Sequence, residues 1–379
     1  MKKLLLLNTK YKIFGGEDSN IVDELKVLKT KYKVSYLEFD NSKKLNLFDL
    51  ISFIFSTNYQ SNRIILQRIE EFKPDIIYIH NTWFKIGTGI FKKLKDLDIK
   101  VYLKIHNFRY DCTSTFLANR HISKGQICPK CGFENSRFTY FNKFYKESYL
   151  KSFLILLYGR SYIKIIKFSN INLLLLTNFH KYYLEQNIND IKRVSVSYNP
   201  IVLSDTKNKY NSSSDYVVYA GRLTKSKGVS ELLKVWKNYN YHLKLLIIGT
   251  GEEYRYLYET FSRNKNIIFK GELSNKETQY WIKNARAVIT TTKMYEGQPR
   301  LLCEASSFMI PSIFPKFGGM SEFFPKDYPY SFTQSDYEDL HKKILLLDNE
   351  DLLLNTSNEI YEFINKINNS SINKFNEDL

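Results

Sequence analysis

Two carboxylates in a short segment with glycine and proline between them carry the most informative chemistry of this sequence. The segment reads YEGQPRLLCEA, and Glu296 and Glu304 lie eight positions apart in it. Proline is favoured at the first position of a helix, where its missing N–H leaves no bond unmade. We therefore predict a helix that begins near Pro299, with Glu296 in the loop before it and Glu304 in its second turn.

The first turn of such a helix suits an anionic ligand. Its amides have no partner within the helix, and the helix dipole favours negative charge there. Amides for a phosphate and carboxylates for hydroxyl groups together indicate a phosphorylated sugar. The plainer interpretation is a surface loop followed by an ordinary helix in which Glu304 is solvated.

A second segment places two cations after an apolar run. Tyr219–Leu223 reads YAGRL, and Lys227-Gly228 follows closely. The planar Arg222 guanidinium suits phosphate oxygens, and Lys227 adds a point charge. The plainer interpretation is a turn beside two solvated charges.

Short apolar runs alternate with charged helical segments, which favours a doubly wound α/β fold. Ligands of such folds bind beyond the carboxyl ends of the strands, where the glycines, histidines and carboxylates of this chain stand. The predicted strands are Leu4–Leu7, Lys33–Phe39, Ile76–His80, Val101–His106, Ile171–Thr177 and Arg193–Tyr198, then Tyr216–Ala220, Leu243–Ile248, Ile267–Phe269, Ala287–Thr291 and Pro311–Phe314.

The length of 379 residues favours two domains. We predict a first domain over 1–200, a polar linker over 201–214 and a second domain over 215–350. A C-terminal helical segment, 351–379, is a candidate for crossing back to the first domain.

Composition limits the class of protein. The 56 Lys and Arg against 39 Asp and Glu give a net charge of +17, which favours phosphorylated or other polyanionic partners. Four cysteines do not indicate a disulfide scaffold. No apolar run approaches the length of about 18 residues that a spanning helix needs. We expect a cytoplasmic protein, with peripheral contact at the inner face of the plasma membrane left open.

The two motifs resemble the family 4 glycosyltransferases, which are retaining enzymes of the GT-B fold. Glu296 and Glu304 match the Glu…Glu signature of that family, and Gly221-Arg222-Leu223 with Lys227-Gly228 matches its Gly-Arg-Leu…Lys-Gly pattern. The segments LLIIGTG, Gly271-Glu272-Leu273 and FGGMSE stand in the same order. The resemblance is strongest from Tyr216 to Glu322.

The first half adds a more specific resemblance. Lys104–Cys112 reads KIHNFRYDC and resembles the His-Asn-x-Arg…Cys run of a subgroup that builds bacterial surface polysaccharides. This implies that His106 contacts the donor sugar, whereas a structural histidine is the plainer interpretation. Gly15 and Gly16 resemble the glycine turn with which family members approach a phosphate or the acceptor.

The resemblance implies two Rossmann-like domains facing across a cleft, the first for the acceptor and the second for a nucleotide diphosphate sugar. Arg222 and Lys227 would neutralise the diphosphate, Glu296 would contact the transferred sugar, and Glu304 the ribose. Catalysis would then need no metal and no covalent intermediate. The remaining residues of the implied donor site are Gly221, Gly271, Gly297, Pro299, Arg300 and Leu301.

The implied acceptor is a polyprenyl-diphosphate-linked saccharide in capsule, O-antigen or exopolysaccharide synthesis. Tyr140–Lys167 interleaves aromatic and aliphatic residues with Lys and Arg. Such a segment can lie in a membrane interface or pack as a helix on its own sheet. Both interpretations remain open at this point.

A cysteine cluster suggests a structural metal. Cys112, Cys128 and Cys131 follow the spacing C-x15-C-x2-C, and zinc needs four ligands, so His121 or His106 would complete the site. The alternative is a group of reduced thiols in a loop.

Two other classes of function compete with this interpretation. Another GT-B enzyme, a nucleotide-sugar 2-epimerase or an inverting transferase, would give a different product. A basic nucleic-acid-binding protein would ignore nucleotide sugars and bind DNA or RNA with a steep salt dependence.

Overall fold

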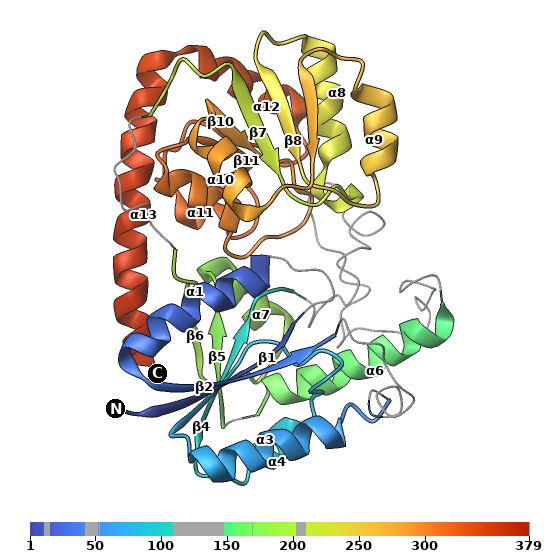
Figure 1. Cartoon of the computed structure of the whole chain (residues 1–379), viewed down its shortest axis with the longest axis vertical. Helices are drawn as coiled ribbons and strands as arrows, with labels where there is room; N and C mark the ends of the chain where they lie inside the picture. The colour runs from blue at the N-terminus through green and yellow to red at the C-terminus, as the bar shows by residue number, and fades with distance from the viewer. Residues whose placement is uncertain are drawn as a thin grey trace. The chain divides into compact units, whose positions relative to one another are not determined.

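The computed structural model describes residues 1–10, 16–41, 52, 54–108, 148–168, 170–201 and 210–378. The chain divides into two units (Figure 1). Pro200 ends the second segment of the N-terminal unit, and Ile201 begins the long segment of the C-terminal unit. The last helix is shared, because the chain from Ser371 groups with the N-terminal unit.

The N-terminal unit holds a six-stranded sheet in the order β2-β1-β3-β4-β5-β6, and its strands pair in parallel. Its strands are β1 (Lys3–Lys10), β2 (Lys33–Asp40), β3 (Ile76–Ile79), β4 (Lys100–Ile105), β5 (Ile171–Leu175) and β6 (Val194–Val196). Its helices are α1 (Gly16–Lys31), α3 (Tyr59–Phe72), α4 (Ile90–Leu94), α6 (Tyr149–Ile166) and α7 (Asn178–Asn187).

The C-terminal unit holds a second six-stranded parallel sheet, in the order β12-β11-β10-β7-β8-β9. Its strands are β7 (Tyr216–Ala220), β8 (Lys244–Ile248), β9 (Ile267–Gly271), β10 (Ala287–Ile289), β11 (Ser312–Pro315) and β12 (Ser331–Phe332). Its helices are η4 (Lys225–Lys227), α8 (Val229–Tyr239), α9 (Tyr254–Phe261), α10 (Asn275–Lys283), α11 (Arg300–Ser307), η5 (Met320–Phe323), α12 (Tyr337–Leu345), η6 (Leu346–Asp348) and α13 (Glu350–Asp378).

Burial of whole strands explains why the apolar runs form these sheets. Parallel strands are covered on both faces, so they consist of continuous apolar residues rather than alternating ones. Leu4–Leu7 of β1 and Val217–Val218 of β7 are fully buried. All eleven predicted strands are present, and the predicted pair of doubly wound sheets is confirmed. The sequence prediction missed β12, a strand of only two residues at the sheet edge.

The first helix begins earlier than the sequence predicts. The amphipathic pattern of the sequence predicts a helix over Asn20–Lys31, whereas α1 begins at Gly16. Glu17 and Asp18 lie in its first turn, where a carboxylate is stabilised by the helix dipole. Gly16 is therefore the first residue of the helix rather than part of a preceding turn, and Gly15 lies outside the described residues.

Helix α6 packs on its own unit, which is one of the two interpretations that the basic aromatic segment left open. Its second half packs on its own unit, since Tyr158 and Ile166 are fully buried and the Tyr158 hydroxyl donates 2.9 Å to the Thr82 carbonyl. Its first turn exposes Tyr149 and Leu150, at 55% and 69%. Most of the helix is therefore a core element, and its N-terminal turn presents apolar side chains to solvent.

The last helix, α13, fixes the backbone of Ile201 by hydrogen bonds. Ile201 donates its N–H to Oδ1 of Asn368 over 2.9 Å and accepts from Nδ2 of the same side chain over 3.0 Å. Asn368 belongs to α13 and is 4% exposed. One amide side chain therefore satisfies both backbone polar groups of the buried residue Ile201.

Replacing that side chain tests this anchor. We expect Asn368→Ala to lower the free energy of unfolding by about 2 kcal/mol, because a buried N–H and a buried carbonyl lose their partner. The matched control is Asn358→Ala on the same helix, where the side chain is exposed and the change should stay within about 0.5 kcal/mol. Urea unfolding of both variants checks this, and equal effects would contradict it.

Candidate active site

The C-terminal sheet reverses its order between β7 and β10, and the loops after these two strands carry the predicted donor residues. Open α/β sheets bind ligands at such a switch point, outside the carboxyl ends of the strands. β7 and β10 pair directly, with Val218 opposite Val288. The segment from Gly221 to Gly228 and the segment from Thr291 to Glu296 are therefore neighbours, although they lie about 70 positions apart.

Close backbone contact joins these two loops. Gly228 has a φ of +68°, and a Cβ there would lie 2.1 Å from the Thr291 carbonyl oxygen. The Thr291 hydroxyl donates 2.9 Å to the Gly228 carbonyl, and the Lys293 N–H donates 2.9 Å to the Ser226 carbonyl. Only glycine fits this position, so the sequence Lys227-Gly228 fixes where the lysine side chain starts.

Lys227 and Glu296 form an ion pair at the switch point. The Lys227 Nζ contacts Glu296 Oε1, and the two side chains are 24% and 27% exposed. The Thr292 hydroxyl donates to the same carboxylate oxygen over 3.2 Å. The Gly319 N–H donates 2.9 Å to the Glu296 carbonyl, which fixes the backbone of that loop. The structure thus brings together the predicted phosphate cation and the predicted sugar carboxylate.

Arg222 follows β7 on the same edge of the sheet and is exposed. Its carbonyl accepts a hydrogen bond of 3.1 Å from the Tyr219 hydroxyl, so the backbone of the turn is fixed while the guanidinium faces solvent. Gly249, after β8, packs against this turn, since a Cβ there would lie 2.0 Å from the Gly221 carbonyl oxygen. Gly249 also donates its N–H to the Gly271 carbonyl over 2.7 Å.

Helix α11 begins at Arg300, which agrees with the predicted start near Pro299. Pro299 has a φ of −82° and a ψ of 92°, so it is the N-cap, and Arg300 is the first helical residue. The reason is that the Pro299 carbonyl already accepts the first helical bond, from the Cys303 N–H over 3.0 Å. Pro299 provides no side-chain cap for the amides of the first turn.

The remaining predicted donor residues lie around this helix end. Glu304 is in the second turn as predicted, and it accepts a hydrogen bond of 2.7 Å from Arg300 Nε. Gly297 and Pro299 are buried, and Leu301 is half-buried. Glu304 is therefore paired with a cation of its own helix, whereas Glu296 is paired with a cation of the neighbouring loop.

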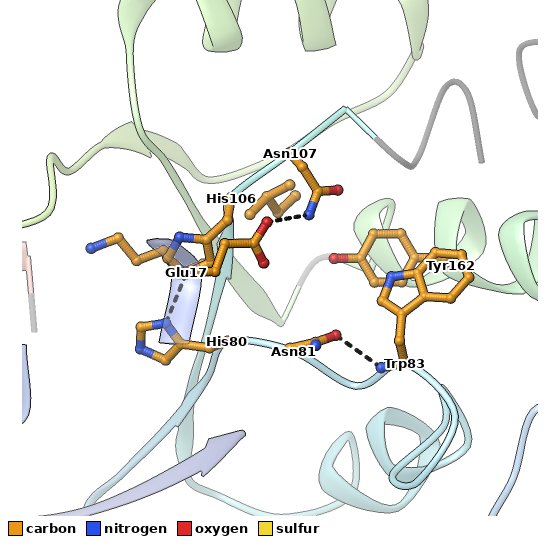
Figure 2. A pocket seen from close by; sticks show the side chains of 9 residues that line it. Glu17, His80, Asn81, Trp83, His106, Asn107 and Tyr162 are labelled. Carbon is orange, nitrogen blue, oxygen red and sulfur yellow. Dashed lines mark hydrogen bonds between the residues drawn. The ribbon is translucent and has the colours of Figure 1, made fainter. Parts of the chain in front are cut away.

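The N-terminal unit brings two histidines together at the ends of adjacent strands. His80 follows β3 and His106 follows β4, and the sheet reverses its order next to β3. His80 Nδ1 lies 2.8 Å from His106 Nε2, and the two side chains point toward each other in Figure 2. The Asn107 amide donates 3.0 Å to Glu17 at the start of α1. The sequence singled out His106, and His80 joins it here.

A buried ion pair that sequence reasoning missed supports the histidines. Lys104 Nζ contacts Glu24 Oε1 over 2.8 Å, and neither side chain is exposed. The Tyr78 hydroxyl donates 2.6 Å to the same oxygen. Lys104 was visible in the sequence as a charge inside the apolar strand VYLKI, which is the signal that a partner must lie opposite it.

Burial keeps both rings neutral. Burial, with a smaller contribution from His80, lowers the pKa of His106 to about 3. Burial, followed by the Lys104 charge, holds the pKa of His80 well below its usual value. Burial likewise lowers the pKa of Lys104, although its pairing with Glu24 opposes that shift. Neither histidine is therefore a cation at neutral pH.

The predicted zinc ligands Cys112, His121, Cys128 and Cys131 lie outside the described residues. Within the described part of the chain, no three or more His, Cys, Asp or Glu side chains gather as a metal site. Among the helices of that part, none is long and apolar enough to cross a membrane. Cys303 is free and buried in α11, as a packing residue would be.

The second half of the chain is similar to known proteins. Residues 204–363 match the family model "Glycosyl transferases group 1", and this stretch contains Arg222, Lys227, Glu296 and Glu304. The amylovoran biosynthesis glycosyltransferase AmsD of Erwinia amylovora is 31% identical over 147 residues. The match covers 36% of this chain and 41% of that relative. The chain thus spans less than half the length of this relative.

Solved structures show the fold over the whole chain. Sucrose-phosphate synthase from Thermosynechococcus elongatus has a TM-score of 0.74 at 10% identity, covering 100% of this chain and 98% of that one. Anabaena HepE in complex with UDP-glucose has a TM-score of 0.65 at 12% identity, covering 100% of both chains. At these identities the likeness establishes the two-domain GT-B fold and nothing finer.

The buried histidines predict that stability falls as the pH is lowered. Burial lowers the pKa of His180 to about 3, as for His106. In the unfolded chain the pKa of a histidine is about 6.5. Below that pH the unfolded state binds a proton that the folded state does not bind, so the free energy of unfolding decreases. Each such histidine should cost about 2 kcal/mol of stability between pH 7 and pH 5.

The measurement is urea unfolding at pH 7 and pH 5 for the wild type and His180→Phe, a variant that removes one titrating ring outside the candidate site. The variant should lose about 2 kcal/mol less than the wild type over this interval. If the free energy of unfolding falls by the same amount from pH 7 to pH 5 in the wild type and in His180→Phe, the expected role of this buried ring is contradicted.

Proposed function

We propose that this protein transfers a sugar from a nucleotide diphosphate sugar to a saccharide acceptor, with retention of configuration at the anomeric carbon. The observation that carries the proposal is the contact between Lys227 and Glu296 at the switch point of the second sheet. It joins a phosphate-binding cation to a hydroxyl-binding carboxylate within the segment that matches the family model.

The diphosphate would lie between Arg222 and Lys227. Arg222 presents an exposed guanidinium at the end of β7, and Lys227 is half-buried in the adjoining turn. As the bond to the sugar breaks, negative charge grows on the departing diphosphate, and fixed cations stabilise it. The uncapped amides of Arg300 and Leu301 would add to this effect. These groups supply the charge compensation that Mg²⁺ gives other transferases, so we propose no metal for this step.

Glu296 would accept hydrogen bonds from the transferred sugar, and Glu304 from the ribose. Glu296 is paired with Lys227, so a diphosphate that binds this lysine would compete with Glu296 for the cation. The carboxylate would then be released toward sugar hydroxyls. Gly271, at the end of β9, would present backbone groups to the base, and we propose same-face attack by the acceptor without a covalent enzyme intermediate.

The proteins to which this chain is similar suggest the ligands. HepE was solved with UDP-glucose, which makes UDP-sugars the first donors to test. AmsD is described as an enzyme of amylovoran biosynthesis, which supports polysaccharide synthesis here. We propose a polyprenyl-diphosphate-linked saccharide as the acceptor. Product analysis separates the rivals, because an epimerase would release the altered sugar without acceptor and an inverting transferase would give the opposite anomer.

Removing the exposed guanidinium tests the donor site. A UDP-sugar that binds the folded state should raise the melting temperature, and Arg222→Ala should weaken that binding by about 10- to 100-fold, the worth of a charged hydrogen bond. The control is Lys234→Ala on α8, which removes an exposed cation away from the switch point. A thermal-shift series with UDP-, GDP- and ADP-sugars gives the measurement.

A ligand-induced shift that survives Arg222→Ala unchanged would remove the phosphate assignment. A shift lost equally in Lys234→Ala would show that only net charge matters. The absence of a shift with all three classes of nucleotide sugar, in the wild type as well, would count against the donor proposal itself.

Membrane contact through the first turn of α6 has its own test. Tyr149, Leu150 and Lys151 are exposed there, an apolar and basic combination suited to an anionic lipid surface. We expect cosedimentation with phosphatidylserine-containing vesicles that weakens with added salt and that Leu150→Glu reduces several-fold. Equal binding to neutral vesicles, or no loss in the variant, would contradict peripheral attachment at this turn.

A further inference from the structure

The histidine pair of the N-terminal unit borders a small pocket at the carboxyl ends of β3 and β4. Glu17, His80, His106 and Asn107 line it, together with Tyr162 from α6 (Figure 2). Its volume is about 10 Å³, which is the space of a single water-sized group. A pocket of this size takes one hydroxyl rather than a whole ring.

The buried carboxylate of Glu24 uses its two oxygens differently. Lys104 and Tyr78 both contact Oε1, at 2.8 and 2.6 Å. Oε2 lies 3.4 Å from His80 Nε2, and neither of these two buried atoms has a hydrogen-bond partner within the described residues. The carboxylate therefore turns one unshared oxygen toward one unshared ring nitrogen.

This arrangement selects one tautomer of His80. A proton on Nε2 faces the carboxylate oxygen and is attracted to it, whereas a bare Nε2 would set two lone pairs against each other in a dry site. With its proton on Nε2, the neutral His80 ring has a bare Nδ1. That nitrogen lies 2.8 Å from His106 Nε2, so it accepts a hydrogen bond from it.

The tautomer of His80 in turn determines the tautomer of His106. His106 donates through Nε2, and as a neutral ring it then has a bare Nδ1. This Nδ1 is buried without a hydrogen-bond partner in the described part of the chain, and its ring borders the pocket. The contacts from Glu24 through His80 to His106 therefore leave the lone pair of His106 Nδ1 available to a ligand.

We propose that Glu24 and His80 are positioning residues, which hold His106 in the Nε2–H tautomer so that its Nδ1 accepts a hydrogen bond from one hydroxyl of the sugar substrate. This inference rests on the proposed sugar transfer. The pocket suits a neutral hydroxyl group, because the Glu17 carboxylate and the bare Nδ1 of His106 are both hydrogen-bond acceptors. A ligand carboxylate would be repelled by both of these groups.

Lys104 compensates the charge of the buried Glu24 carboxylate. A carboxylate with no exposed surface is costly without a cation, and Lys104 supplies that cation at the oxygen that His80 does not face. The ion pair therefore neutralises Glu24 and leaves Oε2 to orient the ring. In the catalytic triads of hydrolases, a buried carboxylate likewise fixes the tautomer of a histidine. Replacing that carboxylate by an amide there selects the wrong tautomer.

The test is the double variant Glu24→Gln/Lys104→Met, which removes both buried charges together and so leaves neither one unpaired. The side-chain amide introduced at position 24 would donate to His80 Nε2, move the His80 proton to Nδ1, and thereby move the His106 proton to Nδ1. Long-range ¹H–¹⁵N spectra of histidine-labelled protein distinguish the two tautomers. The His180 signals in the same spectra provide an internal control.

We expect wild-type His106 to be protonated on Nε2, and the double variant to show the reversed tautomer. The variant should lose about 10- to 100-fold in kcat for sugar transfer while the dissociation constant for UDP stays unchanged. The matched control is Asp23→Asn/Lys26→Met, which removes an ion pair of the same helix, α1, and should keep both tautomer and kcat.

Three results would overturn the proposal. They are a proton on Nδ1 of His106 in the wild type, an unchanged tautomer in the double variant, and a reversed tautomer with unchanged kcat. If the wild type neither binds UDP-sugars nor transfers sugar, the proposed function fails and the hydroxyl assignment fails with it. The tautomer measurement still decides the positioning roles of Glu24 and His80 in that case.

Discussion

Parallel strand pairing is the constraint on which both candidate sites depend. Parallel strands end at the same edge of a sheet, so the loops that follow them meet there whatever their separation in sequence. Direct pairing of β7 with β10 places Lys227 beside Glu296, and direct pairing of β3 with β4 places His80 beside His106. In each unit the register of two neighbouring strands sets a contact between side chains that no local motif specifies.

The two units use ion pairs in different ways. The pair of Lys227 and Glu296 is about a quarter exposed, so a ligand can separate its members while water and the ligand compensate each charge. The pair of Lys104 and Glu24 has no exposed surface, and separating it would leave a buried charge uncompensated. The first pair is therefore suited to binding and release, and the second is suited to holding neighbouring groups in place.

Local signals were enough to predict the strands, because a buried parallel strand is a continuous apolar run that any reading of the sequence finds. They were not enough for contacts between elements. Glu24 looks like an ordinary polar residue of an amphipathic helix, and only the packing of α1 on the sheet shows that it faces Lys104. A boundary failed where polar residues fill the first turn of a helix, as in α1, which begins at Gly16 rather than at Asn20.

The edges of the two sheets differ in the charges that they present. The edge of the C-terminal sheet carries Arg222 and Lys227, so a diphosphate is stabilised there. The pocket of the N-terminal unit carries a carboxylate, Glu17, and two neutral rings, so a diphosphate would meet no unshared cation among its described lining residues. A hydroxyl group, which donates one hydrogen bond and brings no charge, fits that pocket better.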